Sequence, residues 1–149
     1  MGKIRGKLKY YVSVLMYSLF NTRKILRFYS SAKEILPNVD IPPDLPRISV
    51  IEAREKVDRG ELVILDIRGA RDFRKARIEG SINIEFSDIL ANLTQIPKAK
   101  EVGVMCYGGG ASELVTLFLL KQDYPNVRNV DGGIVRWALE VDDSLWDRF

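Results

Sequence analysis

The chain has 149 residues, 46% of them hydrophobic and 29% charged, which is typical of one globular domain with a sizeable core. It contains no histidine and one cysteine, Cys106. The single cysteine excludes an internal disulfide and a second cysteine that resolves an oxidised one. The absence of histidine excludes Ser-His-Asp and Cys-His mechanisms and removes the usual zinc and copper ligands. We therefore expect no metal and no cofactor.

The charge is distributed unevenly along the chain. Residues 1–40 hold eight basic and two acidic residues, whereas the remainder holds 15 basic and 18 acidic residues. The net charge of +3 is thus a property of the N-terminal segment. We do not expect the folded part to bind nucleic acid.

Residues 1–37 form a basic and apolar segment with three open interpretations. An uncharged run over residues 10–22 is flanked by lysines and arginines, but a membrane span needs about 20 apolar residues. The segment could be a helix on an anionic membrane surface, which gives a cytoplasmic, membrane-associated protein. It could be a mitochondrial presequence, because residues 27–31 resemble a cleavage site. Alternatively, it is a helix that packs on the domain or on a second copy.

A proline-rich segment over residues 38–47 predicts an extended linker, and the compact domain is expected over residues 48–149. Ser49 and Glu52 form a capping box, so a helix should begin there and end at Gly60.

Strand patterns then alternate with helix patterns. This alternation predicts an α/β fold with a mainly parallel central sheet flanked by helices. Ligands of such sheets bind at the carboxyl ends of the strands, where Cys106 lies. The expected strands are 62–67, 81–84, 101–106 and 127–130; the expected helices are 72–76, 112–122 and one containing Trp137, with a helical turn over 88–93.

Cys106 stands between an apolar strand and a glycine-rich loop that leads into a helix. The amino end of a helix carries partial positive charge and free N–H groups, which favour a thiolate; cysteines at sites of this kind can have pKa values of roughly 3.5–7.5. The glycines leave space and let N–H groups converge on an anion. The alternative is a small buried hydrophobic residue that ends a strand.

Separated pieces of the chain together resemble the rhodanese-like domain. Their order and spacing fit over residues 48–140, and residues 1–40 lie outside the resemblance. The pieces are Leu-Asp-Ile-Arg at 65–68, Asp-Phe at 72–73, residues 77–84, the loop 106–112, and Asp-Gly-Gly-Ile at 131–134 with Trp137.

The resemblance implies a single-domain sulfurtransferase that carries sulfane sulfur on a Cys106 persulfide by double displacement. It also implies that Arg68 pairs with Asp72 to support the loop. We interpret Asp66 as a turn residue at the strand end and Trp137 as core. The implied sulfur-binding groups are the backbone amides of Tyr107, Gly108, Gly109, Gly110, Ala111 and Ser112.

The loop departs from the family pattern at Ala111, where the family usually has an arginine. Alanine cannot form the bidentate hydrogen bonds that an arginine makes with a dianion, so thiosulfate is not the expected donor. A persulfidated protein, a small persulfide or a polysulfide is expected instead, with a small-molecule or protein thiol as acceptor. Arg71, Arg74 and Arg77 are nearby cations that could compensate.

Other functions stay open. A rhodanese-like module that binds a partner or senses sulfur state without catalysis is favoured by the missing arginine and opposed by the retained cysteine and loop length. A thiolate phosphatase is disfavoured, because its loop needs the arginine. A scaffold recruited to a membrane depends on the N-terminal segment.

Overall fold

The structure is a computed structural model, and it describes residues 19, 22, 23, 26, 30 and 39–149. The three interpretations of residues 1–37 therefore lie outside the described residues, apart from five positions. No helix within the described part is long and apolar enough to cross a membrane.

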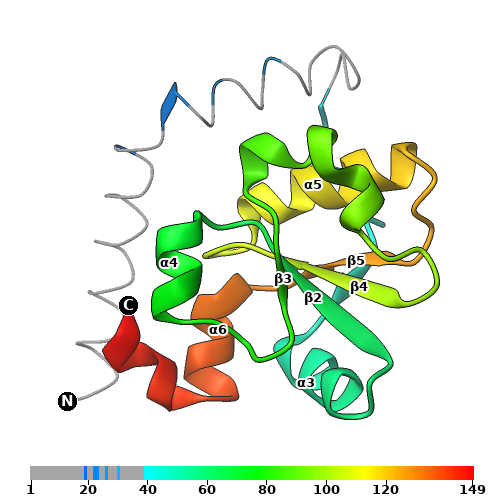
Figure 1. The fold of residues 1–149 in the computed structure, drawn as a ribbon. Coiled ribbons are helices and arrows are strands. Elements are labelled where there is room, and N and C mark those ends of the chain that lie inside the picture. The colour runs from blue at the N-terminus through cyan, green and yellow to red at the C-terminus, as the bar shows by residue number, and fades with distance from the viewer. Residues whose placement is uncertain (1–18, 20–21, 24–25, 27–29, 31–38) are drawn as a thin grey trace.

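Five strands form one sheet in the order β1-β5-β4-β2-β3, and every pair of neighbours is parallel. This confirms the prediction of an α/β fold with a parallel sheet (Figure 1). The strands are β1 (Arg47–Ile48), β2 (Leu62–Asp66), β3 (Ile82–Asn83), β4 (Glu101–Met105) and β5 (Val127–Val130).

The edge strand β1 was not among the predicted elements. Its first residue, Arg47, belongs to the segment that we expected to be a linker, yet Arg47 pairs with Asn129 of β5. Leu45, two residues before Arg47, and Ile48, directly after it, are both buried. A strand of two residues beside prolines has no periodicity to reveal it, since pairing with β5 alone defines it.

Helices cover both faces of the sheet, as Figure 1 shows. The helices α3 (Val50–Asp58) and α6 (Gly133–Glu140) lie on one face. The other face carries α5 (Gly110–Lys121) and two 3-10 helices, η1 (Phe86–Asp88) and η2 (Leu90–Gln95). The short helix α4 (Ala70–Lys75) follows the carboxyl end of β2, and η3 (Asp143–Arg148) follows α6.

Local signals account for several of these elements. The Ser49 hydroxyl caps α3 by accepting the Glu52 N–H at 3.1 Å, as the capping box predicts. Trp137 is 1% exposed and lies in the core cluster between α3, α6 and the sheet, which confirms it as a core residue. A Cβ on Gly103, in the middle of β4, would lie 2.9 Å from Val130 Cγ2, so this strand needs glycine to approach β5.

Candidate active site

Cys106 directly follows β4, at the carboxyl end of the central strand of the sheet. Its side chain is 7% exposed. The Gly109 N–H donates to Sγ at 3.1 Å, and the Ser112 hydroxyl oxygen lies 3.3 Å from Sγ. Gly109 has a φ of +104°, a conformation that favours glycine and turns its N–H toward the sulfur. The loop thus holds the sulfur with one amide and one hydroxyl.

The Ser112 hydroxyl has three neighbours and only one proton. It can donate to Asn129 Oδ1 at 2.6 Å, to the Gly109 carbonyl at 2.9 Å, or to Cys106 Sγ. Ser112 and Asn129 are at most 1% exposed, so each must find its partners within the protein. Asn129 on β5 therefore competes with the sulfur for the serine proton.

The amino end of α6 fixes the backbone of Cys106 and Tyr107. The Ile134 and Val135 amides donate to the carbonyls of Cys106 and Tyr107, at 3.0 and 3.2 Å. A Cβ on Gly133 would lie 2.4 Å from the Tyr107 carbonyl oxygen and 2.5 Å from that of Cys106. Only glycine allows this close approach. The glycine pair at the amino end of α6 is thus part of the site, although it begins 26 residues after Cys106.

Asp66 and Arg68 form a buried ion pair at the end of the neighbouring strand β2. The Arg68 Nε and Nη2 donate to the Asp66 carboxylate at 3.0 and 2.7 Å, and Nη2 also donates to the Ala76 carbonyl. Burial lowers the pKa of Arg68, but the Asp66 carboxylate outweighs this effect and raises it. The expected pair of Arg68 with Asp72 is therefore wrong: the ion-pair partner of Arg68 is Asp66.

The Asp72 carboxylate lies instead near the Tyr107 hydroxyl, whose pKa it raises. Burial raises the pKa of Tyr107, the Asp72 carboxylate raises it further, and the Arg68 cation partly opposes both. The Arg68 guanidinium carbon lies 5.2 Å from the centre of the Tyr107 ring. Tyr107 thus joins the cysteine loop to α4 and to the buried ion pair.

Ala111 is half-buried in the first turn of α5, and residues 106–112 contain no charged side chain. The amides of Gly110, Ala111 and Ser112 belong to this first turn, where backbone N–H groups have no intrahelical acceptor. Of the six amides expected to bind sulfur, that of Gly109 donates to Sγ in the described hydrogen bonds. The site therefore offers dipoles and hydrogen-bond donors to an anion, and no formal charge from the loop itself.

Comparisons with known proteins identify the family. The family model for the rhodanese-like domain matches residues 49–140. The chain belongs to the rhodanese-like family. Cys106, as a single buried cysteine at the carboxyl edge of the sheet, is consistent with the family's active-site cysteine.

Two curated relatives carry sulfur-transfer names. The adenylyltransferase and sulfurtransferase UBA4 of Meyerozyma guilliermondii is 32% identical over 107 residues, covering 66% of this chain and 25% of that protein. A Bacillus subtilis protein named as a sulfur carrier, YrkF, is 31% identical over 95 residues, covering 63% of this chain and 51% of that protein. The chain thus spans about a quarter and about half the length of these relatives.

A solved structure gives the same fold. The crystal structure of a rhodanese-related protein from Thermoplasma volcanium superposes with a TM-score of 0.58 at 26% identity, and covers 64% of this chain and 93% of that protein. The fold and family inferred from the sequence are therefore confirmed.

Sequence reasoning missed two contributors to the site, Asn129 and the Tyr107 side chain. Asn129 lies in a short strand with no motif of its own, and only the pairing of β5 with β4 brings it to Ser112. Tyr107 was predicted for its amide alone. The one available signal was a polar residue inside an otherwise buried strand, which usually marks a specific hydrogen bond.

Proposed function

We propose that this chain is a sulfurtransferase that carries sulfane sulfur as a Cys106 persulfide, with a donor other than thiosulfate. The observation that carries the proposal is the Gly109 N–H directed at a cysteine sulfur from a glycine loop. A sulfur held only as a packing group does not need a left-handed glycine that presents an amide to it. The family membership and the names of the two relatives agree with this chemistry.

In the first step, the Cys106 thiolate attacks the terminal sulfur of a donor persulfide. A bond forms between Sγ and that sulfur, the donor's S–S bond breaks, and the donor thiolate leaves with the bonding electron pair. The persulfide proton stays on the transferred sulfur or passes to solvent. No net oxidation occurs, since the sulfur moves at the same oxidation level.

In the second step, an acceptor thiolate attacks the outer sulfur of the Cys106 persulfide, and Cys106 leaves as a thiolate. The acceptor is a small-molecule or protein thiol. Negative charge rests on sulfur in both steps, where the Gly109 amide and the first turn of α5 stabilise it. No proton-transfer residue is needed, which fits a chain without histidine.

The Ser112 hydroxyl responds to the charge on the sulfur. Beside a neutral thiol, its proton goes to Asn129 Oδ1, the nearer acceptor at 2.6 Å. Beside an anion, the proton turns to the sulfur, because a charge-assisted hydrogen bond is stronger than a neutral one. Ser112 thus adds a second donor when charge develops.

Thiosulfate is a poor fit, because its transfer releases sulfite, a dianion. Residues 106–112 contain no cation that would pair with this leaving group. A persulfide or polysulfide donor releases a group of lower charge. Ala111→Arg should therefore raise the rate with thiosulfate about tenfold or more, with little change for polysulfide.

Mass spectrometry of the intact chain tests the proposal. After incubation with polysulfide or a small persulfide, the wild type should gain one sulfur atom on Cys106 and lose it to added thiol. Cys106→Ser should gain none, and Ala111→Ser, which keeps the cysteine, is the matched control that should still load. If no donor loads sulfur onto Cys106, the proposal is wrong, and the non-catalytic binding module, which the low exposure of Cys106 and the uncharged loop favour, takes its place.

A further inference from the structure

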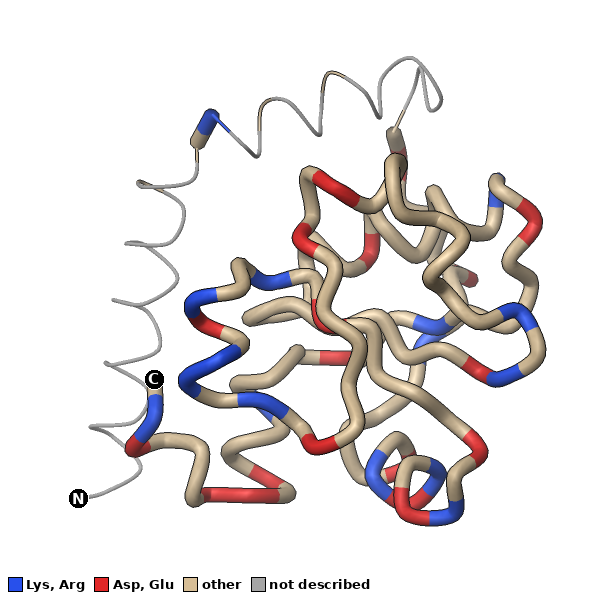
Figure 2. The backbone as a smooth tube through the Cα atoms, viewed as in Figure 1, with Lys and Arg blue, Asp and Glu red and all other residues tan. Residues whose placement is uncertain are grey.

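The surface of α4 carries a group of cations that the proposed reaction does not use. Arg71, Arg74, Lys75 and Arg77 are all exposed, and together they define the α4 basic surface. Figure 2 shows these residues as a blue run beside the central part of the domain. Asp72, the one acid within residues 71–77, lies near the Tyr107 hydroxyl and raises its pKa.

These cations differ from most others in the described part of the chain. None of the four forms an ion pair with another described residue, and Arg77 lies over the Phe73 ring at 5.6 Å. Ion pairs with a carboxylate are formed by Arg47, Arg54, Lys56, Arg59, Arg128 and Arg136, as well as by the buried Arg68. The α4 basic surface is thus free to meet charges from outside the domain.

The α4 basic surface also lies next to the entrance to Cys106. Gly108 and Gly110 are the exposed residues of the loop, and a Cβ on Gly110 would point into open space. The hydroxyl of Tyr107, the residue between Cys106 and Gly108, lies near enough to Asp72 in the first turn of α4 for that carboxylate to raise its pKa. A donor that approaches over the glycines therefore passes beside α4.

The low exposure of the sulfur restricts the shape of this donor. With a side chain that is 7% exposed, Cys106 can be reached by a slender group and not by a flat protein face. A cysteine persulfide on an extended peptide segment has this shape. The residues that flank such a cysteine would then lie over α4, where four cations favour aspartate and glutamate.

We propose that the α4 basic surface docks an acidic peptide segment of a partner protein, whose cysteine exchanges sulfur with Cys106. This inference rests on the proposed function and names the class of its partner. Charge complementarity of this kind raises association rates by about 10- to 1,000-fold at low salt and is screened when the Debye length shrinks. The donor persulfide transfers its terminal sulfur to Sγ and leaves as a peptide thiolate.

Three peptides of equal length, each with one cysteine persulfide, test this. The cysteine is flanked by Asp and Glu, by Ser and Gly, or by Lys, and the second-order rate of sulfur loading onto Cys106 is measured by mass spectrometry on the full chain. We expect the acidic peptide to load about tenfold faster than the neutral one at low salt. This preference should fall to about twofold at 0.5 M salt.

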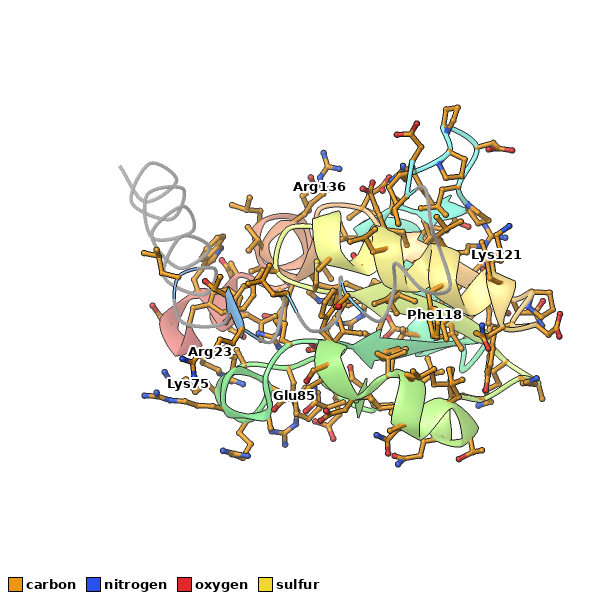
Figure 3. The ribbon with its side chains drawn as sticks, turned by 90° about the horizontal axis from the view of Figure 1, so that it is seen from above. Arg23, Lys75, Glu85, Phe118, Lys121 and Arg136 are labelled. Carbon is orange, nitrogen blue, oxygen red and sulfur yellow. The ribbon has the colours of Figure 1, made fainter. Side chains whose placement is uncertain are left out.

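A charge-reversal variant with a matched control locates the effect. Arg71→Glu/Lys75→Glu should abolish or invert the preference for the acidic peptide, while its rate with the neutral peptide stays within about twofold of wild type. Lys100→Glu/Lys121→Glu makes the same change in charge at exposed positions near the start of β4 and the end of α5. Figure 3 shows Lys75 and Lys121 on opposite sides of the domain, so this control should keep the preference.

The outcomes separate the two proposals. If polysulfide loads Cys106 but the three peptides react at equal rates or not at all, the docking proposal is wrong and the sulfurtransferase proposal stands. If neither polysulfide nor any peptide loads it, the function itself has failed. If Arg71→Glu/Lys75→Glu keeps the peptide preference but loses binding to phosphatidylglycerol vesicles, the surface serves a membrane and the docking proposal is overturned.

Discussion

The sulfur cradle, which comprises residues 106–112 and Asn129, contrasts with the α4 basic surface beside it. The cradle contains no charged side chain, and its cysteine, serine and asparagine are almost completely buried. The α4 basic surface consists of exposed cations without ion-pair partners among the described residues. The cysteine sulfur is thus held by dipoles, whereas the cations without ion-pair partners lie at the surface, where we propose that they recognise a partner.

Burial explains why the two regions differ. A buried cation needs an anion, and Arg68 has one in Asp66 at 2.7 Å. Such a pair would leave little net charge for a substrate. An amide or a hydroxyl can be buried with ordinary hydrogen bonds and still stabilise an anion when one forms.

Gly133→Ala should disrupt the geometry of the cradle. Its Cβ would meet the carbonyl oxygens of Cys106 and Tyr107 at 2.5 and 2.4 Å, and its φ of +59° disfavours alanine. We expect a loss of about 3 kcal/mol in the free energy of unfolding, measured in urea, together with loss of sulfur loading. Gly110→Ala is the control, because no atom lies within 4 Å of its Cβ and its φ is not positive. A similar loss in both variants would contradict the role of close packing.

Ser112→Ala removes one of the two donors to the sulfur and leaves Asn129 Oδ1 without the serine hydroxyl that donates to it. We expect sulfur loading to slow about tenfold or more and the free energy of unfolding to fall by about 1–3 kcal/mol. Thr116→Val is matched, because the Thr116 hydroxyl is equally buried and donates to the Ser112 carbonyl at 2.7 Å without contacting the sulfur. It should lower stability without slowing the reaction. Equal slowing in both would assign the effect to α5 as a whole.

Tyr107→Phe removes the hydroxyl that lies near Asp72 of α4. Burial and Asp72 raise the pKa of Tyr107 in the folded chain, whereas an unfolded tyrosine ionises near pH 10. The unfolded state therefore binds fewer protons above pH 10, and wild-type stability falls as pH rises.

The variant lacks this proton, so its stability should decline less steeply, by about 1.4 kcal/mol at pH 11. At pH 7 it should be less stable than the wild type by about 1 kcal/mol, because the largely buried hydroxyl and its interaction with Asp72 are lost. Urea unfolding at pH 7–11 measures both effects. Parallel stability curves for the two proteins would show that Tyr107 does not keep its proton on folding.

Much of the fold could be predicted, because its signals are local. Alternating strand and helix patterns predicted β2 to β5 and the helices between them, and the capping box placed the start of α3. Separated motifs in the right order identified the family. The edge strand β1 could not be predicted, since two residues beside prolines carry no pattern and only β5 defines them.

The site divides in the same way. The sequence by itself determined which cysteine lies at the end of a central strand, that a glycine loop follows it, and that the usual arginine is missing, because these are properties of neighbouring residues. The tertiary structure alone decided that the Ser112 hydroxyl donates to Asn129 and that Gly133 packs closely against the Cys106 carbonyl. It also decided that Arg68 pairs with Asp66, while Asp72 lies near the Tyr107 hydroxyl. These contacts join residues on different elements, and their choice depends on the strand order and on which groups become buried together, neither of which a local pattern contains.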